Sequence, residues 1–381
     1  MKKLLAVMLA ACAALGLAAC NNNTDDNSGN GDSYTAGNTE YVIGCTGPLT
    51  GDNSSYGISV QEGATLAIEE INANGGLNGV NFKLDMKDDK AAAADAASGY
   101  DMLYEAGMQV ALGSVTSGSC ASFGTKAAQD NLFFITPSAS AANVIETGDN
   151  AFRVCFGDPD QGILAAQEIC AKYETVGVIY DTSDAYSAGI YEAFKEEMAN
   201  LGKEYSLQTF DAENKKDFST QIEALKDCDV IFLPFYYTEA GLVAKAAVAK
   251  GSEAVLFGCD GLDGIADQIN DTVTNLIRYI TPFDVNSEEA NVKSFVTAYQ
   301  AKYNKLPDQF AADGYDAVMV IYEAMKKAGV NDVTIDPAAL CDMLVPVITS
   351  ADFSYTGVTG TMTWETSGAC NKIPVIVELN K

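Results

Sequence analysis

Short apolar runs alternate with longer segments of helical period along the chain from Tyr41 onward. A run such as YVIGC (41–45) has the length of a buried strand, whereas the segment at 58–76 places its apolar residues on one stripe of a helix. This alternation favours parallel sheets covered by helices on both faces. The predicted strands lie at 41–45, 82–86, 109–113, 132–136, 176–181, 205–210, 229–235, 255–258 and 374–379.

The predicted helices fall into two series, because the pattern restarts after Asp158. Two β-α-β-α series predict an α/β protein with two doubly wound parallel-sheet lobes. Two late helices are expected to pack back on the first lobe before the last strand returns to the second, which gives three crossings and a hinge. The predicted helices lie at 58–76, 90–107, 119–130, 160–172, 185–201, 217–227, 238–250, 288–303 and 310–328.

The length of 381 residues supports more than one globular core. We predict a first lobe from residues 40–158 and 283–356, and a second lobe from residues 159–282 and 357–381. The segments before the lobes are predicted to be a signal peptide at 1–19 and a flexible tether at 20–39.

The first twenty residues have the composition of a secretory signal. Lys2 and Lys3 precede an apolar run, Leu4 to Leu17, that is too short to span a bilayer. The following Ala-Ala-Cys20 resembles a bacterial lipobox, which implies that Cys20 is lipidated and anchors the protein outside the bacterial cell membrane. The alternative is an ordinary signal cleaved nearby, with Cys20 incidental.

The chain is strongly acidic, with a formal net charge of −29 that becomes −31 once Lys2 and Lys3 leave with the signal. Such a charge repels nucleic acid and anionic lipid, so neither is expected as a partner. Eight cysteines remain after Cys12 and Cys20, and none forms a CxxC pair, which excludes a zinc ribbon or a redox motif. Export permits disulfides, but the spacing does not reveal their pairing.

Residue types that catalysis commonly needs are scarce. The sequence contains no histidine, which excludes Ser-His-Asp and Cys-His arrangements and histidine-bound metals. Carboxylate-pair or Ser-Lys chemistry remains open, but no motif supports it. We therefore expect no enzyme activity, no catalytic residues, no metal site and no cofactor.

Two neutral, hydroxyl-rich loops follow predicted strands of the first lobe: GSVTSGS (113–119) and TPSASAAN (136–143). Ligands of open parallel sheets bind beyond the carboxyl ends of the strands. Hydroxyl and backbone N–H groups there suit one small carboxylate, while the lack of a GxGxxG or Gly-Lys-Ser/Thr motif disfavours phosphate. Neither Arg153 nor Arg278 lies in these loops, so a dianion clamp is not expected. A small zwitterion, its amine facing an acid, fits best; a solvated turn is the alternative for GSVTSGS.

Six motifs together resemble the branched-chain amino acid-binding lipoproteins of ABC importers, the Leu/Ile/Val-binding protein-like group, over about residues 40–381. The resemblance implies a type I periplasmic binding fold and a monomer that captures an amino acid, Leu, Ile or Val, in an interlobe cleft. It also implies delivery to an ABC permease served by separate ATPase subunits. The alternative is a binding protein or sensor of this fold for an aromatic amino acid, amide or other small carboxylate, signalling through a partner. The motifs are GPLTGDNSSYG (47–57), INANGG (71–76), FITPSAS (134–140), DQG (160–162), DFSTQIEALK (217–226) and DQFAADGYDA (308–317).

The resemblance implies four polar ligand-binding residues. Ser117 matches the serine that holds the ligand carboxylate, and Ser138 and Ser140 match residues that hold the carboxylate and the amine. Asp260 matches an acid that faces the ammonium, at a position where family proteins often carry glutamate. A helix cap is the alternative role for Asp260.

Four aromatic residues complete the implied site. Tyr186 and Tyr236 match rings of the second lobe that close over the ligand, and Tyr56 and Phe310 match positions that touch its side chain. Tyr236 lies between two other aromatic residues, so the sequence leaves open which ring faces the cleft. A core position is the alternative for Phe310.

Overall fold

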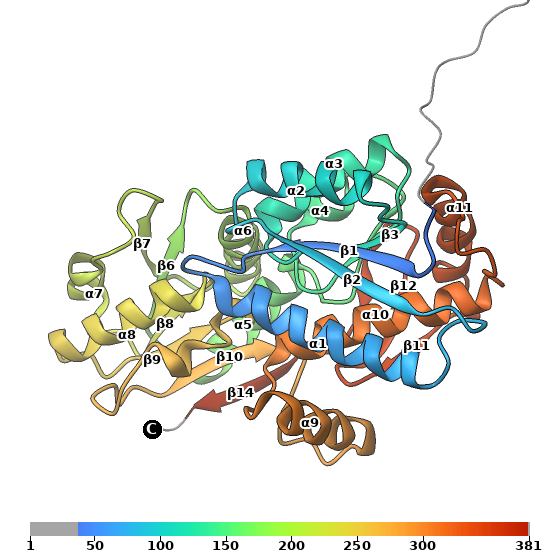
Figure 1. Ribbon diagram of the computed structural model, residues 1–381. Coiled ribbons are helices and arrows are strands. Elements are labelled where there is room, and N and C mark those ends of the chain that lie inside the picture. The colour runs from blue at the N-terminus through green and yellow to red at the C-terminus, as the bar shows by residue number, and fades with distance from the viewer. Residues whose placement is uncertain (1–36, 380–381) are drawn as a thin grey trace, which may run out of the picture. The chain divides into compact units, whose positions relative to one another are not determined.

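Figure 1 shows the computed structural model of the protein, which describes residues 37–379. Within this range the strands form a five-stranded sheet, a six-stranded sheet and a small three-stranded sheet. The predicted signal peptide, the lipidated Cys20 and nearly all of the tether lie outside the described residues. No helix within residues 37–379 has the length and apolar character needed to cross a membrane.

The five-stranded sheet is parallel throughout and has the strand order β2-β1-β3-β4-β5. Four of its strands were predicted, and β5, a three-residue strand, was missed. The strands are β1 (Tyr41–Gly47), β2 (Phe82–Asp88), β3 (Val110–Ser114), β4 (Phe134–Thr136) and β5 (Ala151–Arg153). The helices between them are α1 (Ser54–Ala73), α2 (Ala93–Glu105), α3 (Ser117–Gln129) and α4 (Ala142–Ile145).

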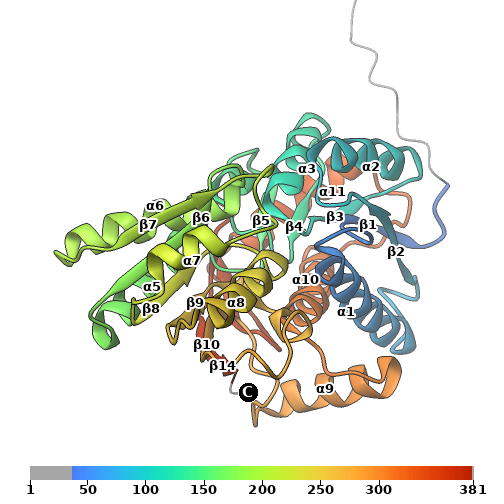
Figure 2. The same ribbon diagram turned by 90° about the vertical axis from the view of Figure 1, so that its left-hand side faces the viewer.

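Helices cover both faces of this sheet, which explains why every residue of β1 is buried. Successive strand residues point to opposite faces. Val110 belongs to the apolar core that includes residues of α1 and α10, and Ala111 to the core that includes residues of α2 and α3. Figure 2 shows α2 and α3 on one side of these strands and α1 with α10 on the other.

The six-stranded sheet has the order β14-β10-β9-β8-β6-β7. Its last strand runs antiparallel to β10, so this sheet is mostly rather than wholly parallel. The strands are β6 (Val176–Asp181), β7 (Ser206–Phe210), β8 (Val230–Leu233), β9 (Val255–Gly258), β10 (Ile277–Thr281) and β14 (Val375–Leu379). The helices are α5 (Asp158–Lys172), α6 (Ala185–Asn200), α7 (Ser219–Leu225) and α8 (Tyr237–Lys250).

The chain then returns to the first lobe, as predicted for the helix that becomes α10. This helix packs closely on α1, because Gly63 and Gly314 carry no side chain at the crossing. A Cβ on Gly63 would collide with the carbonyl of Ala311 in α10. The late helices are α9 (Ala290–Tyr303), α10 (Gln309–Lys327) and α11 (Pro337–Ile348), and the last of them was not predicted.

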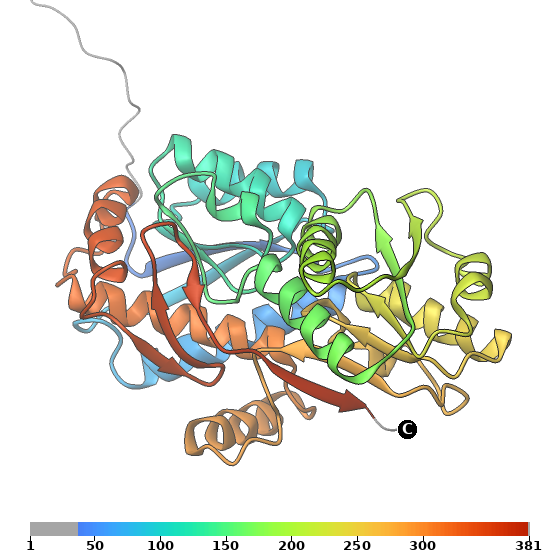
Figure 3. The same ribbon diagram turned by 180° about the vertical axis from the view of Figure 1, so that it is seen from behind.

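A small antiparallel sheet, also not predicted, precedes β14 and is visible in Figure 3. The indole of Trp364 donates to the Arg153 carbonyl at 2.7 Å, so this sheet is bonded to the end of β5. The predicted lobe boundaries remain predictions, and this contact favours a last crossing after residue 371 rather than at 357. The strands are β11 (Tyr355–Gly357), β12 (Gly360–Trp364) and β13 (Cys370–Asn371).

A buried ion pair lies where the chain leaves this sheet for β14. The ammonium of Lys372 is 3.0 Å from an oxygen of Asp313 on α10, and both side chains are at most 2% exposed. Asp316, one turn further along α10, accepts hydrogen bonds from Val358 and Thr359. Burial raises the pKa of Asp313 to about 7, and Lys372 opposes that rise. Lys372 is therefore the cation that allows both acids to be buried.

We predict that Lys372→Met lowers the free energy of unfolding by about 3–5 kcal/mol, because it leaves two buried acids without a cation. Urea unfolding followed by circular dichroism measures this loss. Lys195→Met, which removes an exposed pair with Glu192, is the control and should cost less than about 1 kcal/mol. Equal effects of the two substitutions would contradict the role given to Lys372.

Candidate functional site

A cavity between the two large sheets gathers seven of the eight predicted ligand-binding residues. Its volume is about 10 Å³, roughly the space of one water-sized probe. Both lobes contribute to its wall, since Ser117 follows β3 of the first sheet and Asp260 follows β9 of the second. The lining residues are Tyr56, Val115, Thr116, Ser117, Ser138, Tyr186, Tyr236, Asp260, Gly261 and Phe310.

The hydroxyl side of the cavity is built by the two loops singled out in the sequence. Ser117 is the first residue of α3, and its hydroxyl accepts a hydrogen bond from the Ala141 N–H at 3.2 Å. The hydroxyl of Ser138 donates to the Val115 carbonyl at 2.8 Å. These bonds hold the loops together beside the N-terminus of α3, an end that favours an anion.

Ser140 is the one predicted residue that does not line this cavity. It is fully buried, and its carbonyl accepts hydrogen bonds from the Arg153 guanidinium and from the Asp158 N–H. Within the described residues its hydroxyl has no hydrogen-bond partner, and neither does the hydroxyl of Thr116. Thr116, which the resemblance did not assign, lies in the predicted loop and adds a free hydroxyl to the cavity wall.

Asp260 opens a short 3-10 helix, η1 (Asp260–Leu262), directly after β9. Its carboxylate accepts a hydrogen bond from the Tyr186 hydroxyl at 2.7 Å. Gln161 accepts the Asp260 N–H at 3.0 Å, and Gln309 donates to its carbonyl. Burial raises the pKa of Asp260 to about 6, although Tyr186 and Gln161 oppose the rise. The position after a strand was readable from the sequence; the contacts of Gln161 and Gln309 were not.

Aromatic rings fill the cleft between the hydroxyl loops and the second lobe. Tyr56 stacks on Phe310 at a centroid separation of 4.0 Å, and Tyr186 stacks on Tyr236 at 5.0 Å. The Tyr56 hydroxyl donates to the Gly261 carbonyl across the cleft. Phe310 belongs to the apolar core and also lines the cavity.

The structure shows which of three adjacent rings faces the cavity. Tyr236 lines it, whereas Phe235 packs against Phe210 and Phe218. Tyr237 lies edge-on to Tyr56. The resemblance therefore pointed to the residue of this triplet that lines the cavity.

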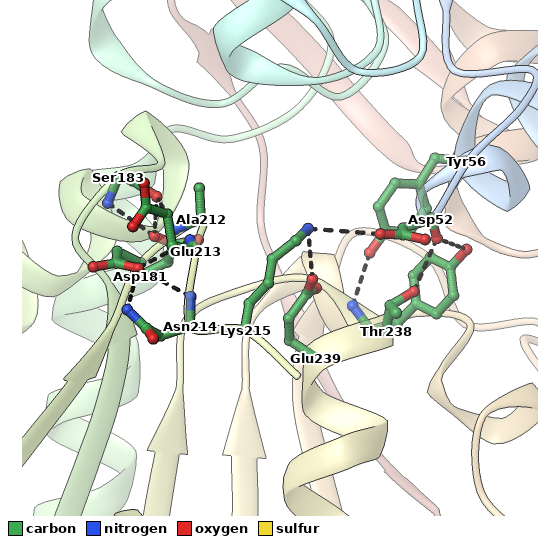
Figure 4. Close-up of polar contacts among 12 residues, drawn as sticks. Asp52, Tyr56, Asp181, Ser183, Ala212, Glu213, Asn214, Lys215, Thr238 and Glu239 are labelled. Carbon is green, nitrogen blue, oxygen red and sulfur yellow. Dashed lines mark hydrogen bonds and ion pairs between the residues drawn. The ribbon is translucent and has the colours of Figure 1, made fainter. Parts of the chain in front are cut away.

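A larger cavity of about 440 Å³ adjoins the inner one, since Tyr236 and Thr116 line both. At its edge the ammonium of Lys215 lies 3.0 Å from Glu239 and 3.7 Å from Asp52 (Figure 4). The Asp52 carbonyl also accepts a hydrogen bond from the Thr238 hydroxyl at 2.9 Å. Asp52 precedes α1 and the other residues belong to the second lobe, so these contacts hold the lobes together at the mouth of the cleft.

Other chemistry is sparse within residues 37–379. No group of three potential metal ligands occurs there, and the eight cysteines of this range are free thiols. A cavity of about 700 Å³ lined by Lys172, Lys226 and Gly251 is a surface depression at the opposite end of the six-stranded sheet. It contains none of the predicted site residues.

Two parallel-sheet lobes with a polar cavity at the carboxyl ends of their strands define the class of two-lobed α/β binding proteins. Residues 40–367 match the family described as periplasmic binding protein. The chain belongs to this family and has its type I fold.

Named relatives refine this comparison. A Leu/Ile/Val-binding protein homolog 1 of Brucella abortus is 28% identical over 77% of this chain and 80% of its own length. A leucine-, isoleucine-, valine-, threonine- and alanine-binding protein of Pseudomonas aeruginosa is 29% identical over 79% of this chain and 82% of its length. The substrate-binding protein LivJ of Streptococcus pneumoniae, solved with isoleucine, is 28% identical, with a TM-score of 0.76 and coverage of 89% of this chain and 100% of that one.

The buried acids make stability depend on pH. Burial raises the pKa of Asp184 and of Asp260 to about 6, above their ordinary value of 3.8. Between these values the native state holds protons that the unfolded chain has lost, so the free energy of unfolding should rise as the pH falls from 7 to 5. Urea unfolding over this range measures the slope.

Asp184→Asn should make that slope shallower, because the amide cannot titrate yet can still accept the Ser187 N–H that Asp184 binds in the α6 cap. Asp229→Asn is the control: its pKa is lowered by Thr175, so it is ionised in both states above pH 5 and should leave the slope unchanged. A slope that rises with pH would contradict this prediction.

Proposed function

We propose that the protein is an extracytoplasmic substrate-binding protein of an ABC importer and binds a branched-chain amino acid. One observation carries this proposal: neutral hydroxyl loops of one lobe face a buried acid of the other across a cavity with aromatic walls. That arrangement complements an α-carboxylate, an α-ammonium and an apolar side chain at the same time. The names of the relatives support leucine, isoleucine or valine as the first ligands to test.

The ligand carboxylate is proposed to lie on Ser117 and Ser138 at the N-terminus of α3, with the free hydroxyl of Ser140 behind them. The ammonium would face Asp260, whose present partner, the Tyr186 hydroxyl, donates a single hydrogen bond and leaves acceptor capacity. Excluding water strengthens both charge pairs, because the effective dielectric constant falls.

Binding requires movement, because a cavity of about 10 Å³ cannot hold an amino acid. The Tyr56 ring stacks on Phe310, and its hydroxyl bonds to Gly261 of the other lobe. Opening of the lobes breaks the bond between Tyr56 and Gly261 and exposes the hydroxyl loops, while Tyr56 and Phe310 stay together on the first lobe. We propose that the aliphatic side chain of the ligand then lies against Tyr56 and Phe310, which makes these two rings the determinants of side-chain preference.

Location and delivery form the remaining part of the proposal. Lipidation of Cys20 would hold the protein at the outer face of the cell membrane, with residues 21–39 as the tether. A closed, ligand-loaded monomer would then dock on a permease that is driven by separate ATPase subunits. An extracytoplasmic location agrees with the periplasmic binding protein family.

Thermal unfolding against a panel of amino acids, amides and small carboxylates tests ligand binding. A ligand at a hundredfold excess over its dissociation constant should add about 2.7 kcal/mol to the free energy of unfolding. We expect this increase with leucine, isoleucine or valine. If no amino acid raises the melting temperature, the proposal is wrong.

Ser117→Ala should reduce the increase, because the ligand carboxylate loses a hydrogen-bond donor. Ser252→Ala is the matched control. Ser252 is also buried, but it precedes β9 and therefore lies at the amino ends of the strands, away from the cavity at their carboxyl ends. It should leave the ligand-induced increase intact even if it lowers basal stability.

Ligand affinity should fall as the pH drops below about 6, because Asp260, whose pKa burial raises to about 6, must be ionised to pair with the ammonium. The α-ammonium and α-carboxylate of the ligand stay charged between pH 5 and 7. Isothermal titration with leucine at pH 5, 6 and 7.5 measures this trend. Affinity that increases toward pH 5 would contradict the pairing with Asp260.

A further inference from the structure

A second buried acid lies in the first turn of α5, bonded through its N–H to Ser140. Asp158 is the first residue of this helix and is 1% exposed. Neither of its carboxylate oxygens has a hydrogen-bond partner within the described residues. A fully buried carboxyl group without a hydrogen-bond partner lowers the stability of the folded protein. The presence of an aspartate at this position therefore calls for an explanation.

Capping of α5 does not explain Asp158. The N–H of Gly157, the residue before the helix, is bonded at 3.0 Å to Asp160 rather than to Asp158. The Asp158 carboxylate instead lies against α6, where a Cβ on Gly189 would be 2.7 Å from its Oδ2 atom. A glycine at this point of α6 therefore leaves room for the carboxylate.

The surroundings of Asp158 connect it to the ligand-binding residues on both sides of the cleft. Its N–H donates to the Ser140 carbonyl at 3.1 Å, and the Ser140 hydroxyl lies beside its carboxyl group, although its geometry falls short of a hydrogen bond. Gln161, in the same turn of α5, accepts the N–H of Asp260. The first turn of α5 thus joins the hydroxyl loops to Asp260.

Several buried polar groups around this turn lack hydrogen-bond partners. The Ser140 hydroxyl, both Asp158 oxygens and the Gln161 side-chain N–H₂ group lack partners among residues 37–379. All three side chains are at least 99% buried, so bulk water does not satisfy them. None of the three lines the inner cavity as it stands, so a ligand group would reach them only when the lobes move. A group with several N–H donors would then satisfy the acceptor oxygens among them. An ammonium, with three donors, has that property.

We propose that Asp158 is a second acid for the ligand ammonium, acting together with Asp260 and selecting amines over plain carboxylic acids. This inference rests on the function proposed above and extends it to substrate class. Two buried acids next to one carboxylate subsite disfavour a ligand that brings only negative charge. An amino acid neutralises them, whereas its deaminated analogue leaves both without a cation.

Isothermal titration with leucine and with 4-methylpentanoate, which is leucine without its amine, tests the proposal at pH 7.5. Asp158→Asn should weaken leucine binding about tenfold or more, the size of a lost charge-assisted hydrogen bond. It should leave 4-methylpentanoate binding unchanged, because this ligand brings no ammonium to pair with Asp158. The ratio of the affinity for leucine to that for 4-methylpentanoate should therefore fall. If both ligands weaken equally, or if leucine affinity is unchanged, the proposal is overturned.

Asp89→Asn is the matched control. Asp89 is also fully buried and has one carboxylate oxygen without a partner, but it follows β2, accepts the Ala91 N–H, and has no contact with Ser140 or Asp260 among the hydrogen bonds of the described residues. This variant should keep the wild-type preference for leucine. A loss of preference in Asp89→Asn would show that any buried acid produces the effect, which would also overturn the proposal.

A second measurement needs no variant and holds if Asp158→Asn fails to fold. Burial and the nearby Asp260 and Asp184 raise the pKa of Asp158 well above its ordinary value, and Arg153 and the Ser140 hydroxyl oppose them. An arriving ammonium should lower that pKa again, so leucine binding should release more protons than 4-methylpentanoate binding does. Binding heats in two buffers of different ionisation enthalpy measure this release. Leucine binding without proton release overturns the role of Asp158; no amino acid binding at all instead refutes the proposed function.

Discussion

The opposition of hydroxyl loops and a buried acid across one cleft is the arrangement on which the proposed function depends. Ser117 and Ser138 come from the first sheet, and Asp260 comes from the second. The carboxyl ends of parallel strands all lie at the same end of a sheet, so the loops that follow them lie next to one another. Because the acid and the hydroxyls belong to different lobes, a ligand that binds both of them also holds the lobes together.

Other groups already interact across the cleft in this structure. Tyr56 bonds to the Gly261 carbonyl, and Lys215 with Thr238 binds Asp52 at the mouth. Ligand binding must therefore compete with contacts that already hold the lobes together, and only the difference in free energy contributes to affinity. Lys372 and Asp313 lie at the last crossing, where a buried pair fixes the path of the chain between lobes.

Much of the fold could be predicted from periodicity, because long amphipathic helices and fully buried strands leave strong patterns. Short elements such as β5 leave little pattern, and α11 contains Pro346, which usually argues against a helix interior. Seven of the eight proposed site residues line one cavity, but family resemblance rather than spacing singled them out. Asp158 was not found, since its significance lies in missing hydrogen bonds that only coordinates reveal.

A crystal structure of the protein grown with leucine tests the central claim most directly. The account predicts the ligand carboxylate within hydrogen-bond distance of Ser117, the ammonium facing Asp260, and the ligand side chain in contact with the Tyr56 and Phe310 rings. Leucine bound at another surface, or bound in the cleft with its ammonium toward the hydroxyl loops and away from Asp260, would contradict it.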